Sequence, residues 1–305
     1  MYARRRGCNR LMRDILVIGA GGRVGKPLMA SLGQRALGVH RRPTPGRAGF
    51  DLANQDLADV MSRPEGVTHA IILAGITSPE AIVAHPSIAC AINVEGTLAL
   101  VDRLFDWEII PVFISSDAVL GLSQNCSNES TLVRPQTLYG QMKRQVEEAL
   151  IAHTGDWLIL RLPRVYGLKI GDGSLITSLC ERLLIGGEVP AACDQKFNPI
   201  YIDDVTQAIE AVVDQRLVGL YHLGGAQTVT NFEVAELVLL EISRYLSVTA
   251  TIKPCSINDF VRYETRPCNI AMDSGKITTA LGLNFMNIKH ACHVVVAAAL
   301  QNAGE

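Results

Sequence analysis

Apolar and polar positions alternate along this chain in two periods, one typical of buried strands and one typical of amphipathic helices. Six short runs rich in Val, Ile and Leu predict strands at residues 14–18, 36–40, 68–73, 109–115, 156–161 and 219–223. Apolar residues that recur every three to four positions predict helices at residues 24–32, 55–62, 88–104, 138–152, 174–185, 203–214, 231–245, 274–280 and 287–300. Strands that alternate with helices favour βαβ units. The pattern therefore predicts an α/β fold built on a parallel sheet.

Two glycine-containing breaks predict that the chain leaves this sheet twice. A Gly-rich stretch covers residues 166–174, and Gly224 and Gly225 follow the sixth strand. We therefore expect a smaller, discontinuous C-terminal substrate lobe, with the ligand cleft between the two lobes. The predicted sheet domain comprises residues 12–165 and 199–225, and the predicted lobe comprises residues 166–198 and 226–305.

The composition limits the class of protein. The chain has 305 residues, of which 48% are hydrophobic and only 5% aromatic, as expected of a parallel sheet buried on both faces. A formal net charge of −2 argues against nucleic-acid partners, and we find no apolar run long enough to span a membrane. Eight scattered cysteines without a C-x-x-C motif indicate reduced thiols in a cytoplasmic protein, with a zinc site or disulfides as the weaker alternative. We predict no metal site.

The amino terminus carries several arginines but lacks the apolar run of a secretory signal. Met12 precedes the first strand and would be a natural start. We interpret residues 1–11 as a disordered or non-native extension.

A glycine-rich turn follows the first strand. Gly19, Gly22 and Gly25 are spaced G-x-x-G-x-x-G, and a helical pattern starts near Val24. Such a turn lets the backbone approach a pyrophosphate, and the N-terminus of the helix supplies N–H groups and a partial positive charge. The turn predicts a Rossmann-type, doubly wound sheet that binds a dinucleotide.

The end of the second strand indicates which dinucleotide. An enzyme that prefers NAD would place Asp or Glu here to bind the ribose 2′-hydroxyl. This chain instead has His40, Arg41 and Arg42, whose positive charges would pair with a 2′-phosphate. NADP(H) is therefore favoured. NAD(H) stays an alternative in which these arginines are solvated.

Tyr139 and Lys143 lie four residues apart in the predicted helix 138–152, so one face of that helix carries both side chains. A nearby ammonium would favour the phenolate, and we therefore expect a lowered Tyr139 pKa. Ser115 and Ser116 end the fourth predicted strand, where ligands bind in open α/β sheets. A hydroxyl, a tyrosine and a lysine together predict a site that reduces a carbonyl or oxidises an alcohol. The alternative is a surface Tyr beside a solvated Lys.

With this glycine turn and this Ser/Tyr/Lys set, the chain resembles the extended short-chain dehydrogenases/reductases that act on nucleotide sugars. These belong to the NAD-dependent epimerase/dehydratase superfamily. The resemblance covers nearly all of residues 14–283 and selects Ser116 over Ser115, which implies a catalytic set of Ser116, Tyr139 and Lys143. Together with the turn and strand-end residues above, it assigns cofactor contacts to Gly19, Gly21, Gly22, Arg23, Val24, Gly25, His40, Arg41, Arg42, Asp51, Leu52, Leu73, Ala74, Gly75, Asn93, Tyr139, Lys143, Leu162 and Pro163.

Further motifs are most similar to those of the dTDP-4-dehydrorhamnose reductase family. The triplet Ser116-Asp117-Ala118 lacks the glutamate that dehydratases carry at this place, and the segment Arg266-Pro267 is similar to that family's tail. The resemblance implies substrate contacts from Ser116, Asp117, Arg164, Asn198 and Arg266, the last of which would hold the diphosphate. Pro163-Arg164 replaces the Ser-Trp of many reductases, so the sugar and the nucleotide stay open.

The sequence as a whole indicates an NADPH-dependent reductase of the 4-keto group of a nucleotide-linked deoxysugar, with a dTDP sugar as the first choice. A 4-epimerase with the same Ser/Tyr/Lys set is one alternative. Another is a non-catalytic NADP-binding subunit, because the Arg161-x-Pro163 form is similar to the regulatory β subunit of methionine adenosyltransferase. The sequence leaves the oligomeric state open, with a homodimer as one arrangement.

Overall fold

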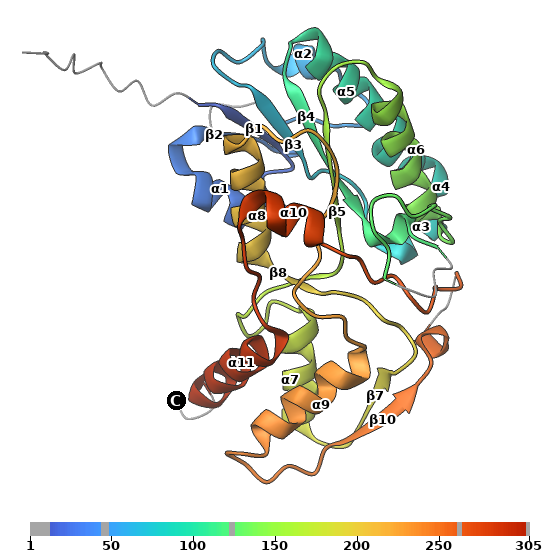
Figure 1. The fold of residues 1–305 in the computed structure, drawn as a ribbon, viewed down its shortest axis with the longest axis vertical. Coiled ribbons are helices and arrows are strands. Elements are labelled where there is room, and N and C mark those ends of the chain that lie inside the picture. Colours follow the sequence, from blue (N-terminus) through green and yellow to red (C-terminus); the bar gives the residue numbers. More distant parts are fainter. Residues whose placement is uncertain (1–12, 44–48, 122–125, 261–263, 303–305) are drawn as a thin grey trace, which may run out of the picture.

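A computed structural model describes residues 13–43, 49–121, 126–260 and 264–302, and the interpreted extension at residues 1–11 lies outside these ranges. Within them, six strands form one parallel sheet in the order β2-β1-β3-β4-β5-β9 (Figure 1). The strands are β1 (Ile15–Ile18), β2 (Ala36–Val39), β3 (His69–Ile72), β4 (Ile110–Ser116), β5 (Leu158–Leu162) and β9 (Gly219–His222). Each overlaps a strand predicted from the sequence, and the predicted α/β fold with a parallel sheet is confirmed.

Helices cover both faces of the sheet because successive side chains of each strand point to opposite faces. Ile15 and Val17 join a core under α1 (Gly25–Leu32) and α8 (Ile202–Asp214). Leu16 and Ile18 join a second core under α5 (Thr97–Asp106) and α6 (Leu138–Ala152). All four β1 side chains are buried, which explains their unbroken apolar run.

The order in which strands are added to the parallel sheet changes sides at β1. From β1 the chain forms β2 on one side and then crosses to form β3 on the other, so the sheet's switch point lies between β1 and β3. Ligands of open α/β sheets bind outside the carboxyl ends of the strands at such a point. The glycine turn after β1 and residues 73–76 after β3 both lie there.

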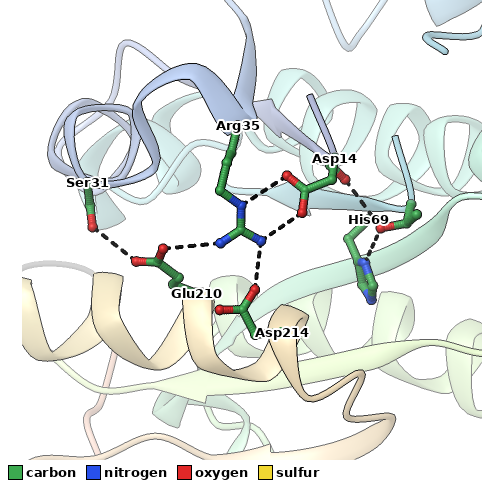
Figure 2. Close-up of polar contacts among 7 residues, drawn as sticks. Asp14, Ser31, Arg35, His69, Glu210 and Asp214 are labelled. Carbon is green, nitrogen blue, oxygen red and sulfur yellow. Dashed lines mark hydrogen bonds and ion pairs between the residues drawn. The ribbon is translucent and has the colours of Figure 1, made fainter. Parts of the chain in front are cut away.

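Arg35 forms ion pairs at the opposite, amino-terminal end of the sheet (Figure 2). Its guanidinium contacts Asp14 beside β1 at 2.7 Å and Glu210 and Asp214 on α8 at 3.2 and 2.7 Å. This four-residue network fixes α8 against the amino-terminal ends of β1 and β2, away from the carboxyl ends of the strands.

A second group of elements builds the lower part of Figure 1. Helices α7 (Leu175–Ile185), α9 (Asn231–Ile242) and α11 (Ile288–Asn302) pack together over β7 (Glu188–Ala192) and β10 (Thr251–Cys255), a parallel pair that the sequence did not predict. The short strands β6 (Val165–Tyr166) and β8 (Ile200–Tyr201) pair where the chain passes between the two groups. The domain boundaries at residues 165, 198 and 225 stay a prediction.

One helix of the predicted second lobe packs elsewhere. Helix α10 (Gly275–Leu281) lies against α8 and β9, and its Ile277 and Leu281 belong to the core of the central sheet. The end of the chain therefore contributes to both cores.

The remaining helices are short. They are α2 (Leu57–Val60), α3 (Pro79–Ala84) and α4 (Pro86–Cys90), with 3₁₀ turns at Gly33–Arg35, Asp117–Val119 and Ile257–Phe260. The helix predicted at 88–104 is interrupted by a π-helical segment, Ala91–Gly96, before α5 begins. Among the described helices, none has the length and apolarity to cross a membrane.

Candidate active site

A cleft of about 720 Å³ opens at the carboxyl ends of β1, β3, β4 and β5, where the sheet meets the second group of elements. It brings together most of the chemically important candidates from the sequence. Its lining includes Gly22, Arg23, Val24, Gly25, Leu73, Gly75, Ser116, Asp117, Tyr139, Lys143, Leu162, Pro163, Arg164 and Arg266.

The two serines at the end of β4 have different partners. Ser115 also lines the cleft, but its hydroxyl donates to Oε1 of the fully buried Glu147 at 2.6 Å. The Ser116 hydroxyl donates to Asp117 Oδ1 at 2.9 Å and accepts from the Ala118 N–H, which places it at the start of a 3₁₀ turn in the cleft. This geometry favours Ser116 as the hydroxyl that a ligand would meet.

Tyr139 and Lys143 lie on the first turns of α6, which Thr137 caps by accepting from the Gly140 N–H at 3.1 Å. The Lys143 ammonium donates to the Ile114 carbonyl at 2.8 Å and lies 5.8 Å from the centre of the Tyr139 ring. Burial lowers the pKa of Lys143 to about 8, although Glu147 opposes this shift.

The expected lowering of the Tyr139 pKa is wrong. Burial, reinforced by the negative charge of Asp117, raises the pKa of Tyr139 well above its usual value. Spacing along a helix shows that Lys143 is near, but it does not show how completely the phenol is desolvated. Tyr139 is therefore a protonated group at neutral pH and is suited to donate a proton.

Three side chains with ionisable groups, Asp117, Arg164 and Arg266, line the same cleft. Burial raises the pKa of Asp117 to about 6, against the opposing hydrogen bond from Ser116 and the charge of Arg164. Arg164 lines the cleft, where its guanidinium carbon lies 5.5 Å from the centre of the Phe197 ring. Desolvation of the guanidinium and the positive charge of Arg266 lower the pKa of Arg164. Among the described residues, Arg164 has no carboxylate at ion-pair distance, and its one side-chain hydrogen-bond acceptor is Asn231 Oδ1 at 3.4 Å. The cleft can therefore accept a ligand with negative charge.

The glycine turn fits a dinucleotide. A Cβ on Gly19, whose φ is +93°, would lie 2.8 Å from the Ala74 nitrogen, and one on Gly25 would collide with the Gly19 carbonyl. Gly22 is exposed and lines the cleft. Among the described residues, none caps the start of α1 with its side chain, and its first turn holds no acidic residue. The turn and the helix N-terminus thus offer a compact surface for phosphate oxygens.

Several predicted cofactor contacts do not line this cleft. Arg41 and Arg42 are exposed beyond β2, next to His40, whose ring lies over Gly21. Asp51 accepts from the Ala53 N–H and from Asn54, while Leu52 is buried. These assignments, with those of Gly19, Gly21 and Ala74, stay predictions.

Two predicted contacts instead hold loops in place. Asn93, on the π-helical segment, bonds both the N–H and the carbonyl of Ile76 at 2.7 and 2.8 Å and so fixes the segment after β3. Asn198 was predicted to contact the substrate. It is buried, donates to Thr228 and accepts from the Met272 N–H outside the cleft lining, so its contact with the substrate stays a prediction.

The cleft also contains residues that sequence reasoning missed. Glu264 accepts from the Leu138 N–H at 2.7 Å, directly at the start of α6. Gln195 donates to the Pro267 carbonyl at 2.8 Å, and Phe197 lies under Arg164. These residues come from segments distant in sequence. The one available signal was proximity in sequence, since Gln195 and Phe197 lie close to the candidate Asn198 and Glu264 lies close to the candidate Arg266.

A family model, the RmlD substrate-binding domain, matches residues 12–301 of this chain. The chain belongs to this family. The resemblance predicted from the motifs is thereby confirmed.

Relatives of the chain include proteins of two kinds. A dTDP-4-dehydrorhamnose reductase from Aggregatibacter actinomycetemcomitans is 24% identical over 284 residues, covering 89% of this chain and 94% of the relative. Methionine adenosyltransferase 2 subunit beta from Danio rerio is 27% identical over 237 residues, covering 73% of this chain and 72% of the relative. The solved dTDP-4-dehydrorhamnose reductase from Bacillus anthracis str. Ames, in complex with NADP, matches with a TM-score of 0.76 at 19% identity, covering 92% and 97% of the two chains. The last likeness shows the shared fold.

Proposed function

We propose that this chain uses NADPH to reduce the 4-keto group of a nucleotide-linked deoxysugar, with a dTDP sugar as the first choice. The observation that carries the proposal is that Ser116, Tyr139 and Lys143 line one cleft together with Arg164 and Arg266. Membership of the RmlD family and the reductase relatives support it.

The cofactor would lie along the switch point of the sheet. The glycine turn and the start of α1 would hold its pyrophosphate, Lys143 its nicotinamide ribose, and Arg41 and Arg42 a 2′-phosphate. When bound, NADPH supplies a hydride to the substrate carbonyl. NAD(H) is the alternative if the exposed arginines make no contact with the cofactor.

The protein's own groups would complete the reduction. The Ser116 hydroxyl would turn from Asp117 to the substrate carbonyl oxygen and stabilise the charge that develops there. Tyr139, which is protonated at neutral pH, would donate the proton to that oxygen. Arg266 would bind the diphosphate, for which a planar guanidinium is better suited than an ammonium.

The chain's other properties agree with a cytoplasmic enzyme that binds neither nucleic acid nor membrane. The seven described cysteines are all free thiols, as expected in a reducing compartment. A homodimer is proposed as the assembly, and size-exclusion chromatography with light scattering would test it.

A second candidate is a regulatory subunit that binds NADP without turnover. The relative from Danio rerio favours it because its name places it in a methionine adenosyltransferase. Copurification with a methionine adenosyltransferase, in the absence of reductase activity, would support this reading.

The deciding experiment measures NADPH oxidation against a panel of dTDP-, UDP-, GDP- and CDP-linked 4-keto sugars. Turnover of one or more of them supports the reductase. Tightly retained oxidised cofactor with interconversion of 4-hydroxyl epimers would replace the reductase with an epimerase. Absence of NADPH oxidation across the panel would overturn the reductase, and absence of epimer interconversion would overturn the epimerase.

A further inference from the structure

A buried carboxylate lies on the same helix as the catalytic candidates. Glu147 is fully buried on α6 and accepts from several donors. The Ser115 hydroxyl and Arg161 Nε donate to its Oε1 at 2.6 and 2.9 Å, while Arg161 Nη2 and Arg144 Nη1 approach its Oε2 at 2.7 and 3.3 Å. The pair with Arg161 is bidentate and both partners are inaccessible to solvent, so it is rigid rather than a surface ion pair.

The network continues to β9 through His222. Arg161 Nη1 lies 3.2 Å from His222 Nε2, and His222 Nδ1 lies 3.0 Å from the Ser127 carbonyl. Because a guanidinium only donates and a carbonyl only accepts, His222 must carry its proton on Nδ1 and be neutral. Burial lowers the pKa of His222, which agrees with the neutral form.

The position of Glu147 connects it to the whole candidate site. Tyr139, Lys143 and Glu147 are spaced four residues apart and therefore share one face of α6. Ser115 directly precedes Ser116 on β4, and Arg161 directly precedes the lining residue Leu162 on β5. A single carboxylate thus joins the helix that carries Tyr139 and Lys143 to the two strand ends that carry Ser116 and Leu162.

The same carboxylate also acts on Lys143. Burial disfavours the ammonium, and Glu147 is the charged group that opposes this effect. Tyr139, on the same helix, is the titratable group beside Lys143. The charge of Asp117 acts on Tyr139, and Arg161 on β5 is paired with Glu147. From β4, the Phe113 ring and the Ile114 carbonyl contact the ammonium directly.

We propose that Glu147 is a positioning residue that fixes the positions of Tyr139, Lys143 and Ser116 relative to one another and keeps Lys143 charged in the cleft. Its effect on turnover rests on the proposed reductase function, but its effect on Lys143 does not. The test therefore begins with a measurement that needs neither substrate nor cofactor.

That measurement is the pH dependence of Lys143 acetylation by acetic anhydride, followed by mass spectrometry. In the native protein Lys143 should titrate near pH 8. In Glu147→Gln the ammonium loses its supporting charge, so its titration should move to lower pH. Glu147→Asp keeps the charge and should restore most of the shift. Glu148→Gln is the matched control, because Glu148 is the adjacent residue of α6 and pairs with Arg144 at an exposed position.

Removing one partner of a buried ion pair is strongly destabilising, so Glu147→Gln can fail to fold. In that case the double variant Glu147→Gln/Arg161→Met carries the test, because it does not leave the Arg161 guanidinium buried without its carboxylate. A lowered Lys143 titration in either variant, with Glu148→Gln unchanged, supports the proposal. A titration that stays at the native pH in the folded variant overturns it.

Kinetics test the positioning role. If the panel yields a substrate, Glu147→Gln should lower kcat by about 100-fold through displaced reacting groups. Its activity should also decline at lower pH than native activity does, because the ammonium is lost earlier as pH rises. A native kcat and pH profile would overturn the positioning role. If the native protein turns over no substrate, the reductase proposal fails while the labelling result on Lys143 still stands.

Discussion

The Ser116 hydroxyl donates to Asp117 Oδ1 across 2.9 Å, so two adjacent polar side chains at the end of β4 hold one another inside the cleft. Burial raises the pKa of Asp117 to about 6, and its charge is therefore costly at neutral pH. Clusters of such perturbed groups are typical of functional sites, where binding or chemistry is favoured over stability.

Replacing this carboxyl should stabilise the protein in a pH-dependent way. Folding raises the pKa of Asp117, so the folded state holds this proton more tightly than the unfolded state does. The resulting contribution to the free energy of unfolding is fully present below pH 3.8, the unfolded pKa, and is lost as pH rises through about 6. Asp117→Asn should therefore raise the free energy of unfolding at pH 8 by up to about 3 kcal/mol and change it little at pH 4. Urea unfolding at both pH values measures this, with the exposed Asp156→Asn as control. Equal effects at both pH values would contradict the burial of a charged Asp117.

Removing the proton donor should affect chemistry far more than binding. Tyr139→Phe should lower kcat by about 10²–10⁴-fold while the Kd for NADPH stays near the native value. Steady-state kinetics and fluorescence titration give the two quantities. Tyr245→Phe, at a side chain that is 55% exposed, should leave both unchanged. Native turnover by Tyr139→Phe would falsify the catalytic assignment.

Cofactor preference should depend on the arginines after β2. Replacing Arg41 and Arg42 with Ala should weaken NADPH binding at least tenfold and NADH binding little, since a charge-assisted bond contributes about 1.5–3 kcal/mol. Titration of both cofactors measures this, with Arg182→Ala, an exposed arginine on α7, as control. An unchanged NADPH-to-NADH ratio would leave the choice of NADP without support.

Diphosphate recognition should depend on geometry as well as on charge at position 266. Arg266→Ala should weaken the binding of dTDP about tenfold or more, and Arg266→Lys should recover only part of the loss because an ammonium lacks the planar fork. Isothermal titration calorimetry with dTDP needs no turnover. The control is Arg244→Ala, which removes an exposed arginine after α9. Native affinity in Arg266→Ala would place the diphosphate elsewhere in the cleft.

The central sheet could be predicted because its strands are buried on both faces. Ile15–Ile18 is an unbroken apolar run, and Leu158–Leu162 is apolar except for Arg161. Both lengths match strands, and Gly19 ends β1 where a positive φ is needed. The strands β7 and β10 could not be found in this way. Their sequences, Glu-Val-Pro-Ala-Ala and Thr-Ile-Lys-Pro-Cys, contain proline and exposed positions, and they pair only through the tertiary fold.

In the candidate site too, residues with local sequence signals could be predicted, and properties set by the tertiary fold could not. Ser116, Tyr139 and Lys143 follow local signals, namely a strand end and a helical spacing, and they line one cleft. The pKa of Tyr139 and the role of Asn198 depend on burial and on partners distant in sequence, such as Asp117 and Met272. A sequence pattern indicates which helix or strand carries a side chain. It does not indicate the burial and the contacts that the other elements give to that side chain.

The last helices have a consequence for how this protein is made. Ile277 on α10 belongs to the core of the sheet, whereas Val295 on α11 belongs to the core of the second group of elements. During synthesis, neither core is complete until residues 275–302 have left the ribosome, although all six sheet strands emerge earlier. The nascent chain therefore exposes apolar surface from both halves at once, which is the condition under which chaperones bind. A chain ended prematurely after β9 would lack part of each core and would be expected to be degraded rather than to persist as an independent half.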